Sequence, residues 1–234
     1  MKRLAIIPAR GGSKRVPKKN IKKFCGKPMI SYPIDALKRS ELFDSIHVST
    51  DCNEIAELVI NLGLDIDFLR DPSLADDFTP IMPVLEWTLM QYKAREIIFD
   101  EVIMVMPCTP FIQSSDFLDA YKLFSAANKK SPVISISSYP VPIEWAFNLK
   151  ISDNSLTPVN PGMFKIRSQD IQKKYHDAGA FVLYSSEHIL KANLSKQDEN
   201  YIGFVLDKIK AIDIDDQDDW DFAELIMQST LRKK

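Results

Sequence analysis

The alternation of short apolar runs with segments of helical period constrains the fold of this chain more than any other feature. The first run, LAIIPA at residues 4–9, is apolar throughout, which is typical of a strand covered on both faces. Similar runs lie at residues 44–50, 101–107, 132–138, 178–184 and 209–215. Helical segments between the runs imply βαβ units, and therefore an α/β fold with a mainly parallel sheet and helices on both faces. Ligands bind such sheets at the carboxyl ends of the strands.

Residue types at the segment ends predict where several helices begin. Pro28 suits a first helical position, and DCNE at residues 51–54 forms a capping-box pattern for a helix closed by Gly63. The Thr-Pro pair at residues 79–80 is expected to open a third helix. Two more helices are expected near residues 186–193 and from about residue 217.

Residues 139–177 interrupt the alternation. They contain four prolines and short alternating runs such as EWAFNLK, but no segment with a good helical pattern. We predict a hairpin or irregular excursion, too short and too polar to form its own core. With 234 residues, 45% of them hydrophobic, the chain suffices for one large domain spanning residues 1–234 that carries this excursion.

Bulk charge and cysteine usage exclude several classes. The net charge of −2 creates no global field that favours nucleic acid or an anionic membrane as a partner. No apolar stretch approaches 18 residues, and the first residues lack the features of a secretory signal. The chain is therefore expected to be cytoplasmic. Cys25, Cys52 and Cys108 fit no metal or redox spacing, so we expect buried or idle thiols in a reducing compartment.

The stretch RGGSKRVPKKN at residues 10–20 directly follows the first apolar run. Five of its eleven residues are Lys or Arg, and it matches neither a Walker A loop nor GxGxxG. A Gly-Gly turn can direct backbone N–H groups at an oxyanion, Arg10 can bind phosphate oxygens bidentately, and lysines act as point charges. A solvated basic loop is the alternative, but it leaves the glycines and the position at a strand end as coincidences. We predict a phosphate loop, and the number of cations fits a triphosphate better than a monophosphate.

A second motif, Asp213-Ile214-Asp215, lies near the other end of the chain. On a strand, residues two apart share a face, so both carboxylates are expected to point one way while Ile214 packs. Two carboxylates suit Mg²⁺, which takes water and substrate phosphate oxygens as its other ligands. The remaining acids of residues 216–221 are expected to complement the dipole of the last helix.

The histidines are too dispersed for a zinc site. His47 lies within an apolar run and is expected in the core. His176 and Asp177 differ, because they fall where the excursion rejoins the sheet, with Arg167 and Gln169 just upstream. This junction is a candidate substrate-binding region.

The motifs IPARGGSKRVPKKNI, GKP, STD and DID together resemble those of CMP-sialic acid synthetase-like cytidylyltransferases. The resemblance extends from residue 3 to about residue 226. It implies a three-layer, Rossmann-like nucleotide-diphospho-sugar transferase fold in which residues 139–177 form a hairpin-type dimerisation and sugar-recognition element. The protein is thus expected to be a homodimer.

Within that family the chain is more similar to pseudaminic acid cytidylyltransferases, through RSQDIQKKYHDAG and SYPVPIEWAF. N-acylneuraminate enzymes usually show Asn-Gly where this chain has Ala178-Gly179. They also carry Gln-Pro-Thr-Ser-Pro-Leu-Arg where residues 106–112 read MPCTPFI. This difference removes a Gln and an Arg that face the sugar in those relatives.

The resemblance also implies a role for each matching residue. The catalytic residues are Arg10, Lys19, Asp213 and Asp215, with Mg²⁺ on the two aspartates. CTP is bound by Arg10, Gly11, Gly12, Ser13, Lys19, Asn20, Lys27, Arg70, Asp77 and Thr79. In that set Asn20 and Arg70 serve the cytosine and ribose side, with Asp77 and Thr79 nearby, and the others serve the phosphates. The sugar is bound by Arg167, Gln169, Tyr175, His176 and Asp177.

The implied reaction is attack by the anomeric hydroxyl of a nonulosonic acid on the α-phosphorus of CTP, giving the CMP-sugar for surface glycan synthesis. His176 or Asp177 can be considered as a general base, although metal-assisted deprotonation is simpler. Two alternatives stay open. One is activation of a different sugar, N-acylneuraminate or legionaminate, and the other is a non-catalytic nucleotide-binding regulatory module.

Overall fold

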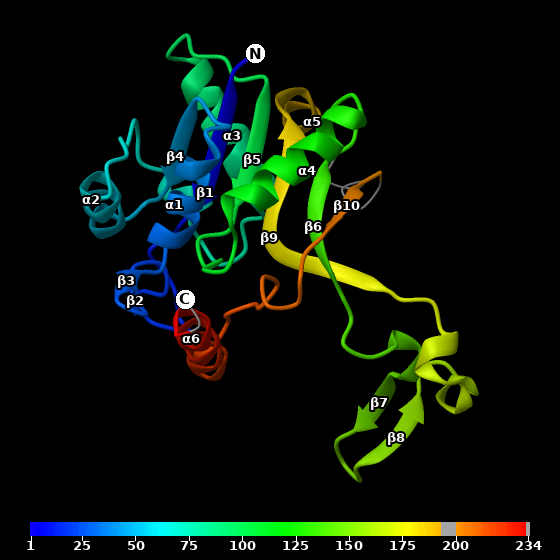
Figure 1. The fold of residues 1–234 in the computed structure, drawn as a ribbon. Coiled ribbons are helices and arrows are strands. Elements are labelled where there is room, and N and C mark those ends of the chain that lie inside the picture. Colours follow the sequence, from blue (N-terminus) through cyan, green and yellow to red (C-terminus); the bar gives the residue numbers. More distant parts are fainter. Residues whose placement is uncertain (193–199, 233–234) are drawn as a thin grey trace.

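The computed structural model describes residues 1–192 and 200–232, and within them the main sheet has six strands in the order β10-β6-β9-β5-β1-β4 (Figure 1). The strands are β1 (Arg3–Pro8), β4 (Ser45–Ser49), β5 (Glu101–Val105), β6 (Val133–Ser138), β9 (Tyr175–Ser185) and β10 (Ile202–Val205). Neighbouring strands are parallel except at β9, which is antiparallel to both β5 and β6. The predicted mainly parallel α/β sheet is therefore confirmed.

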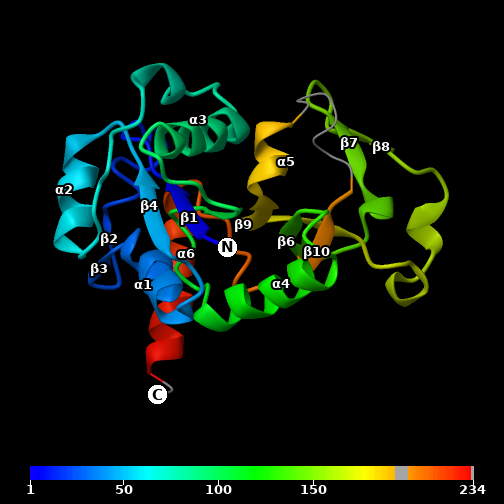
Figure 2. The same ribbon diagram turned by 90° about the horizontal axis from the view of Figure 1, so that it is seen from above.

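Helices cover both faces of this sheet, giving three layers (Figure 2). Ala5 and Ile7 of β1 belong to a core with α1 (Ser31–Ser40), α2 (Asn53–Asn61) and α4 (Ser114–Ala126). Leu4 and Ile6 belong to the core on the opposite face, with α3 (Ile81–Lys93) and α5 (Ser186–Leu190). Successive strand residues point to opposite faces, so an apolar run without polar alternation is required by burial on both sides.

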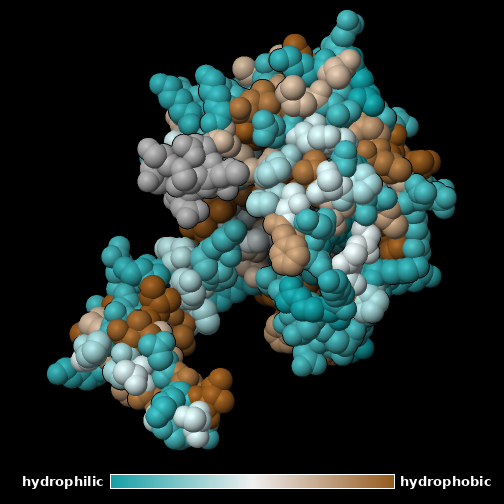
Figure 3. Space-filling model, turned by 180° about the vertical axis from the view of Figure 1, so that it is seen from behind, coloured by the Kyte–Doolittle hydropathy of each residue, from teal (hydrophilic) through white to brown (hydrophobic). Residues whose placement is uncertain are grey.

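Residues 139–174 form an arm that projects from the sheet (Figure 1). Its hairpin consists of β7 (Phe147–Lys150) and β8 (Ser155–Pro158), and single 3₁₀ turns occupy Ile143–Trp145, Met163–Lys165 and Ser168–Asp170. The arm begins where the N–H of Tyr139 donates to the carbonyl of Lys174 at 3.1 Å. Residues 175–177 pair with β6 and belong to the sheet rather than to the arm. Hydrophobic side chains gather on the surface of the arm, as Figure 3 shows.

The prediction of a strand at residues 209–215 is wrong. The last strand is β10, and residues 206–215 are an irregular connection to α6 (Gln217–Leu231). The alternation of Ile212 and Ile214 with polar residues arises because these two side chains pack against a small core, not because the segment joins a sheet. Period-two burial has the same sequence signature in both cases.

Two predicted helix starts are also wrong, whereas others hold. Pro28 lies in a two-residue ladder, β2 (Lys23–Phe24) with β3 (Lys27–Pro28), and α1 begins only at Ser31. Asp51 does not cap α2, which begins after Cys52 without a side-chain cap. Pro80 precedes α3 as predicted, and Gly63 closes α2 with a φ of 75°. The predicted helix at 186–193 is the short α5, and residue 193 lies outside the described residues.

A small core beside the main sheet positions the site, and we call it the satellite core. Its buried members are Val16, Phe24, Met29, Ile214, Trp220 and Ala223. Phe24 meets Trp220 edge to face, with 5.3 Å between the ring centroids. The satellite core therefore joins residues of the first 30 positions to the segment before α6 and to α6 itself.

Candidate active site

The basic loop, residues 10–20, lies at the carboxyl edge of the sheet, as predicted. β1 and β5 are parallel neighbours, so the loop after β1 meets the segment after β5. Between them is a cavity of about 340 Å³. Its lining consists of Pro8, Arg10, Ser13, Lys14, Arg15, Val16, Lys19, Asn20, Met106, Pro107, Cys108, Gly179, Asp213 and Asp215.

Hydrogen bonds to the segment after β4 and within the loop itself fix the turn at its start. The Gly11 N–H donates to Asp51 Oδ1 at 3.1 Å, and Asn20 Nδ2 donates to the Arg10 carbonyl at 3.0 Å. A Cβ on Gly11 would lie 2.9 Å from the Cβ of Cys52, so this close approach requires glycine. Asp51 thus serves the loop rather than α2, which explains the failed capping prediction.

Acidic side chains hold most of the cations of the loop. Arg10 Nη1 lies 2.7 Å from Asp77 Oδ1, and Lys14 pairs with the same carboxylate. Arg15 Nη1 lies 2.8 Å from Asp215 Oδ2. Three cations of the basic loop are therefore paired with carboxylates at the cavity.

Asp213 and Asp215 face the loop across the cavity, although no strand carries them. Ile214 between them is 1% exposed in the satellite core, which turns both carboxylates toward the cavity. The pKa of Asp213 is raised, first by burial and then by the charge of Asp215. A divalent cation would relieve both effects, because it compensates lost hydration and screens like-charge repulsion. The residues present therefore fit a metal ion.

The protein ligands available to such an ion are few. In residues 1–192 and 200–232 no group of three or more His, Cys, Asp or Glu side chains is arranged to hold a metal. Two carboxylates with water and substrate oxygens are the usual surroundings of Mg²⁺, whereas a structural zinc or calcium site needs a fuller set of protein ligands. The donor set thus matches magnesium brought together with a phosphate substrate.

Three other residues predicted to bind CTP, namely Arg70, Thr79 and Lys27, do not line the cavity. Arg70 is buried beside β4, donating to the Ser49 carbonyl at 2.5 Å, and burial lowers its pKa to about 10. The Thr79 N–H donates to Asp76 Oδ1 in the turn that presents Asp77 to Arg10. Lys27 is outside the cavity and pairs with Asp35 at 3.5 Å.

The five predicted sugar-binding residues do not line the cavity in a single chain. Arg167 and Gln169 are exposed on the arm, where Arg167 Nε pairs with Asp170 at 2.9 Å. Tyr175, His176 and Asp177 begin β9. Asp177 Oδ1 accepts from the N–H of Gly179 at 2.8 Å, and Gly179, with a φ of 60°, brings its backbone into the cavity wall.

Several residues around the cavity were not predicted as part of the site. Met106, Pro107 and Cys108 follow β5 and line the cavity, and Asp51 follows β4 and accepts from the Gly11 N–H. Their position after parallel strands is the signal that points to them, since the carboxyl ends of such strands share an edge. The Cys108 thiol therefore lies at the cavity, although its sequence spacing indicated no function. Burial raises its pKa to about 12, so it is a protonated donor rather than a nucleophile.

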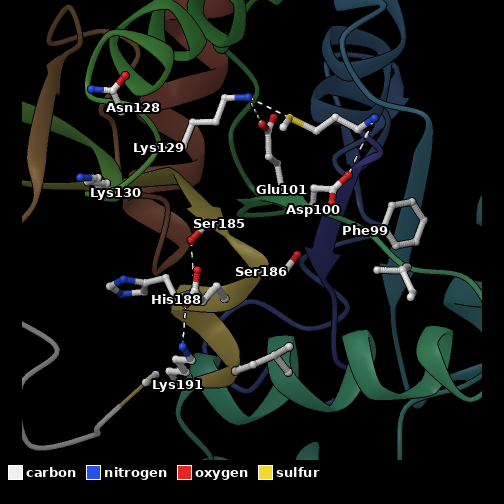
Figure 4. A pocket seen from close by; sticks show the side chains of 15 residues that line it. Phe99, Asp100, Glu101, Asn128, Lys129, Lys130, Ser185, Ser186, His188 and Lys191 are labelled. Atoms are coloured by element: carbon white, nitrogen blue, oxygen red, sulfur yellow. Dashed lines mark hydrogen bonds and ion pairs between the residues drawn. The ribbon is translucent and has the colours of Figure 1, made fainter.

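A larger cavity, about 1000 Å³, lies at the opposite edge of the sheet (Figure 4). Its charged groups largely pair with one another, Lys129 with Glu101 and Lys191 with Glu187. It contains no residue predicted for nucleotide, metal or sugar. None of the helices within the described ranges combines the length and apolarity that a membrane-spanning segment needs.

Cations at the end of a buried central strand thus face paired carboxylates across one cavity. This arrangement is typical of nucleotidyltransferases, a class in which cations bind the phosphates and a carboxylate-held metal shares their charge.

A family model described as cytidylyltransferase matches residues 4–189, and the chain belongs to this family. A pseudaminic acid cytidylyltransferase of Campylobacter jejuni is 35% identical over 226 residues, which cover 97% of this chain and 96% of that protein. A CMP-N,N'-diacetyllegionaminic acid synthase of Legionella pneumophila is 29% identical, covering 97% of each chain.

The fold has solved counterparts. A CMP:2-keto-3-deoxy-manno-octonic acid synthetase, solved in complex with CTP, superposes with a TM-score of 0.68 at 15% identity, over 98% of this chain and 100% of that one. At this identity the likeness concerns the fold alone. It agrees with the predicted Rossmann-like fold.

Proposed function

We propose that the protein transfers the CMP group of CTP to a nonulosonic acid, with pseudaminic acid as the favoured substrate, and releases pyrophosphate. The observation that carries the proposal is the position of Arg10, Lys19 and the Asp213/Asp215 pair around one cavity. The 35% identity to a pseudaminic acid cytidylyltransferase over nearly the full length supports the substrate. A cytoplasmic location fits the use of CTP.

In the proposed reaction the anomeric hydroxyl of the sugar attacks the α-phosphorus. A bond forms from that oxygen to phosphorus and the hydroxyl proton passes to solvent water, while the bond from phosphorus to the oxygen bridging to the β-phosphate breaks and pyrophosphate leaves with the electron pair. Catalysis of such a step depends mainly on in-line positioning and charge neutralisation. Arg10, Ser13 and Lys19 are suited to hold the departing pyrophosphate.

Asp213 and Asp215 are proposed to hold Mg²⁺. When bound there, the ion supplies positive charge to the α-phosphate and lowers the pKa of a coordinated hydroxyl. Both carboxylates are kept in place by residues of this chain, Ile214 through its packing and Lys19 through its bond to the Ile214 carbonyl at 2.6 Å.

We further propose that the arm pairs with a second copy of the chain. Its β7 and β8 residues are exposed almost throughout, and apolar side chains such as Leu149, Ile151, Leu156 and Phe164 are more than half exposed. Apolar surface of this extent on a two-stranded projection needs a partner. A partner chain would also complete the sugar site, since Arg167 and Gln169 lie outside the cavity of their own chain.

Pyrophosphate release tests the proposal. The protein is incubated with Mg²⁺, each of the four nucleoside triphosphates and a panel of pseudaminic, legionaminic and N-acetylneuraminic acids. Release is expected with CTP and pseudaminic acid, with the CMP-sugar identified by mass spectrometry. Release with N-acetylneuraminic but not pseudaminic acid would overturn the substrate, and no release with any sugar would overturn the enzymatic function.

The paired aspartates also decide against a non-catalytic nucleotide-binding module. A binding module needs cations for the phosphates, but it has no need to hold two carboxylates together against their repulsion. If CTP bound tightly while every sugar left it intact, the module would become the better interpretation.

A further inference from the structure

Cys108 lies where the segment after β5 meets the basic loop. Its Sγ is 3.4 Å from Asn20 Oδ1, so the thiol donates a hydrogen bond to that amide oxygen. The side chain is partly buried and lines the cavity beside Lys19, Asp213 and Asp215. It is thus held between the nucleotide loop and the proposed metal site.

Asn20 continues the chain of hydrogen bonds from Cys108. Its side chain is 5% exposed, and both ends of the amide bond to the protein: Oδ1 to Cys108, and Nδ2 to the Arg10 carbonyl at 3.0 Å. An amide oriented in this way cannot turn toward a ligand without leaving buried polar groups unpaired. The geometry therefore gives Asn20 a role in fixing the loop.

The third member of the chain is Arg10, at the start of the loop. The Arg10 carbonyl accepts from Asn20, and the N–H of the next residue, Gly11, donates to Asp51. The Arg10 guanidinium pairs with the carboxylate of Asp77. Two anchors, Asn20 and Asp51, therefore define the turn from both sides. The Asp51 anchor comes from the segment after β4, and the Asn20 anchor depends in turn on Cys108 in the segment after β5.

We propose that Cys108 is a positioning residue for the triphosphate: its thiol orients the Asn20 amide, which clamps the Arg10 carbonyl and so aims the phosphate-binding turn. This inference rests on the proposed CTP site. Because Arg10 contacts phosphates in the ground state and in the transition state alike, losing the clamp weakens CTP binding in both. Such a loss raises KM for CTP with little change in kcat.

A pair of variants separates the hydrogen bond from simple packing. Cys108→Ala removes the donor, and Cys108→Ser keeps a hydroxyl donor in nearly the same volume. We expect Cys108→Ala to raise both KM and the calorimetric Kd for CTP about tenfold, which corresponds to ~1.4 kcal/mol. Cys108→Ser is expected to restore both constants to within about twofold. The KM for the sugar should not change in either variant.

Two further measurements isolate the route through Asn20. In a double-mutant cycle, Asn20→Ala combined with Cys108→Ala is expected to bind CTP no more weakly than Asn20→Ala alone, since both remove the same clamp. Cys25→Ala is the control, because this thiol lies 3.8 Å from the Glu224 carbonyl, beside α6 and outside the cavity. It should leave CTP binding at the wild-type value.

The outcomes are distinct. If Cys108→Ala binds CTP as tightly as wild type, if Cys108→Ser behaves like Cys108→Ala, or if the losses of the cycle are additive, the positioning role is wrong. If Cys108→Ala fails to fold, the isosteric pair Cys108→Thr and Cys108→Val provides the same contrast between donor and no donor. A wild-type protein that does not bind CTP at all contradicts the proposed function itself, and this is seen before any variant is made.

Discussion

The ammonium group of Lys19 donates to the carbonyl oxygen of Ile214 at 2.6 Å, across 195 positions of sequence. Its Nζ also lies 3.5 Å from Asp215 Oδ1. One side chain therefore joins the basic loop to the acidic segment. The cation is placed to neutralise phosphate charge, and the same contact holds the proposed metal ligands.

Lys19→Met should lower kcat/KM for CTP by roughly 100-fold, since it removes a preorganised charge and a support of the acidic segment. Steady-state pyrophosphate release measures the effect. Lys22→Met is a control, because Lys22, just after the loop, also reaches the C-terminal part of the chain, through Gln217 of α6 at 2.9 Å, but lies outside the cavity. If both variants lose activity equally, the effect of Lys19 is structural only.

Asp215→Asn should reduce turnover about 100-fold or more by weakening the metal site. The fold should persist, because the substitution lessens the repulsion that helps to raise the pKa of Asp213 and removes only partly exposed ion pairs. Circular dichroism and a melting temperature within about 3 °C of wild type would document this. Asp218→Asn, in the first turn of α6, is the control. Near-normal turnover of Asp215→Asn would show that the metal lies elsewhere.

Asp77→Asn is expected to bind pyrophosphate at least about threefold more tightly, because Asp77 pairs with Arg10 and Lys14 and competes with an incoming anion. Isothermal titration with pyrophosphate alone reports on the phosphate contacts without the base. Asp71→Asn is the control, because the Asp71 carboxylate accepts from Ser73 and pairs with neither Arg10 nor Lys14, so its affinity should match wild type. Unchanged or weaker pyrophosphate binding by Asp77→Asn would contradict the competition.

Stability should fall as the solution becomes acidic, because of His47. Burial lowers the pKa of His47 to about 4. Tyr92 donates its hydroxyl proton to Asp67, so its oxygen accepts from His47 Nδ1, and Nε2 is buried without a partner. The unfolded chain, with an ordinary histidine pKa, binds more protons between pH 4 and 6.5, so stability is complete above that range and is lost as pH falls through it.

Urea unfolding at pH 7 and pH 5 measures this linkage. Wild type should lose about 2 kcal/mol more between the two pH values than His47→Leu, as follows from 1.4 kcal/mol per pH unit over the titrating range. Equal losses in the two proteins would mean that other groups titrate instead.

Leu149 and Leu156 face each other on the arm hairpin, 57% and 59% exposed. Replacing both with Ser should convert the expected dimer to a monomer in light scattering, because the arm loses the apolar surface that a partner chain would bury. Phe222→Ser with Leu225→Ser changes a similarly exposed pair on α6 and should keep the dimer. A wild-type monomer at micromolar concentration would contradict the proposed pairing.

The sequence predicts the sheet well because burial on both faces leaves uninterrupted apolar runs, as in LAIIPA of β1. It does not indicate strand direction: AGAFVLY reads the same whether parallel or antiparallel, and only the structure shows that β9 is reversed. The predicted strand at residues 209–215 is wrong because side chains that pack on the satellite core alternate with polar ones as they would on a strand.

For the site, the basic loop and Asp213/Asp215 could be predicted because each is a local pattern of charge. The bond between Lys19 and Ile214, the anchor from Asp51 to Gly11 and the contact of Cys108 with Asn20 could not. Each joins segments that only the folded chain brings together. Asp51 illustrates the difficulty, since its spacing to Glu54 fits a helix cap while its carboxylate serves a different element.

Because β9 runs opposite to β6, the chain leaves the sheet and returns to it at one edge, with Ser138 paired to Tyr175. The arm is therefore attached to the sheet through two neighbouring strand ends. On the proposed roles, a change in the arm alters the dimer contact and the placement of Arg167 and Gln169, whereas the basic loop and Asp213/Asp215 belong to other segments of the chain.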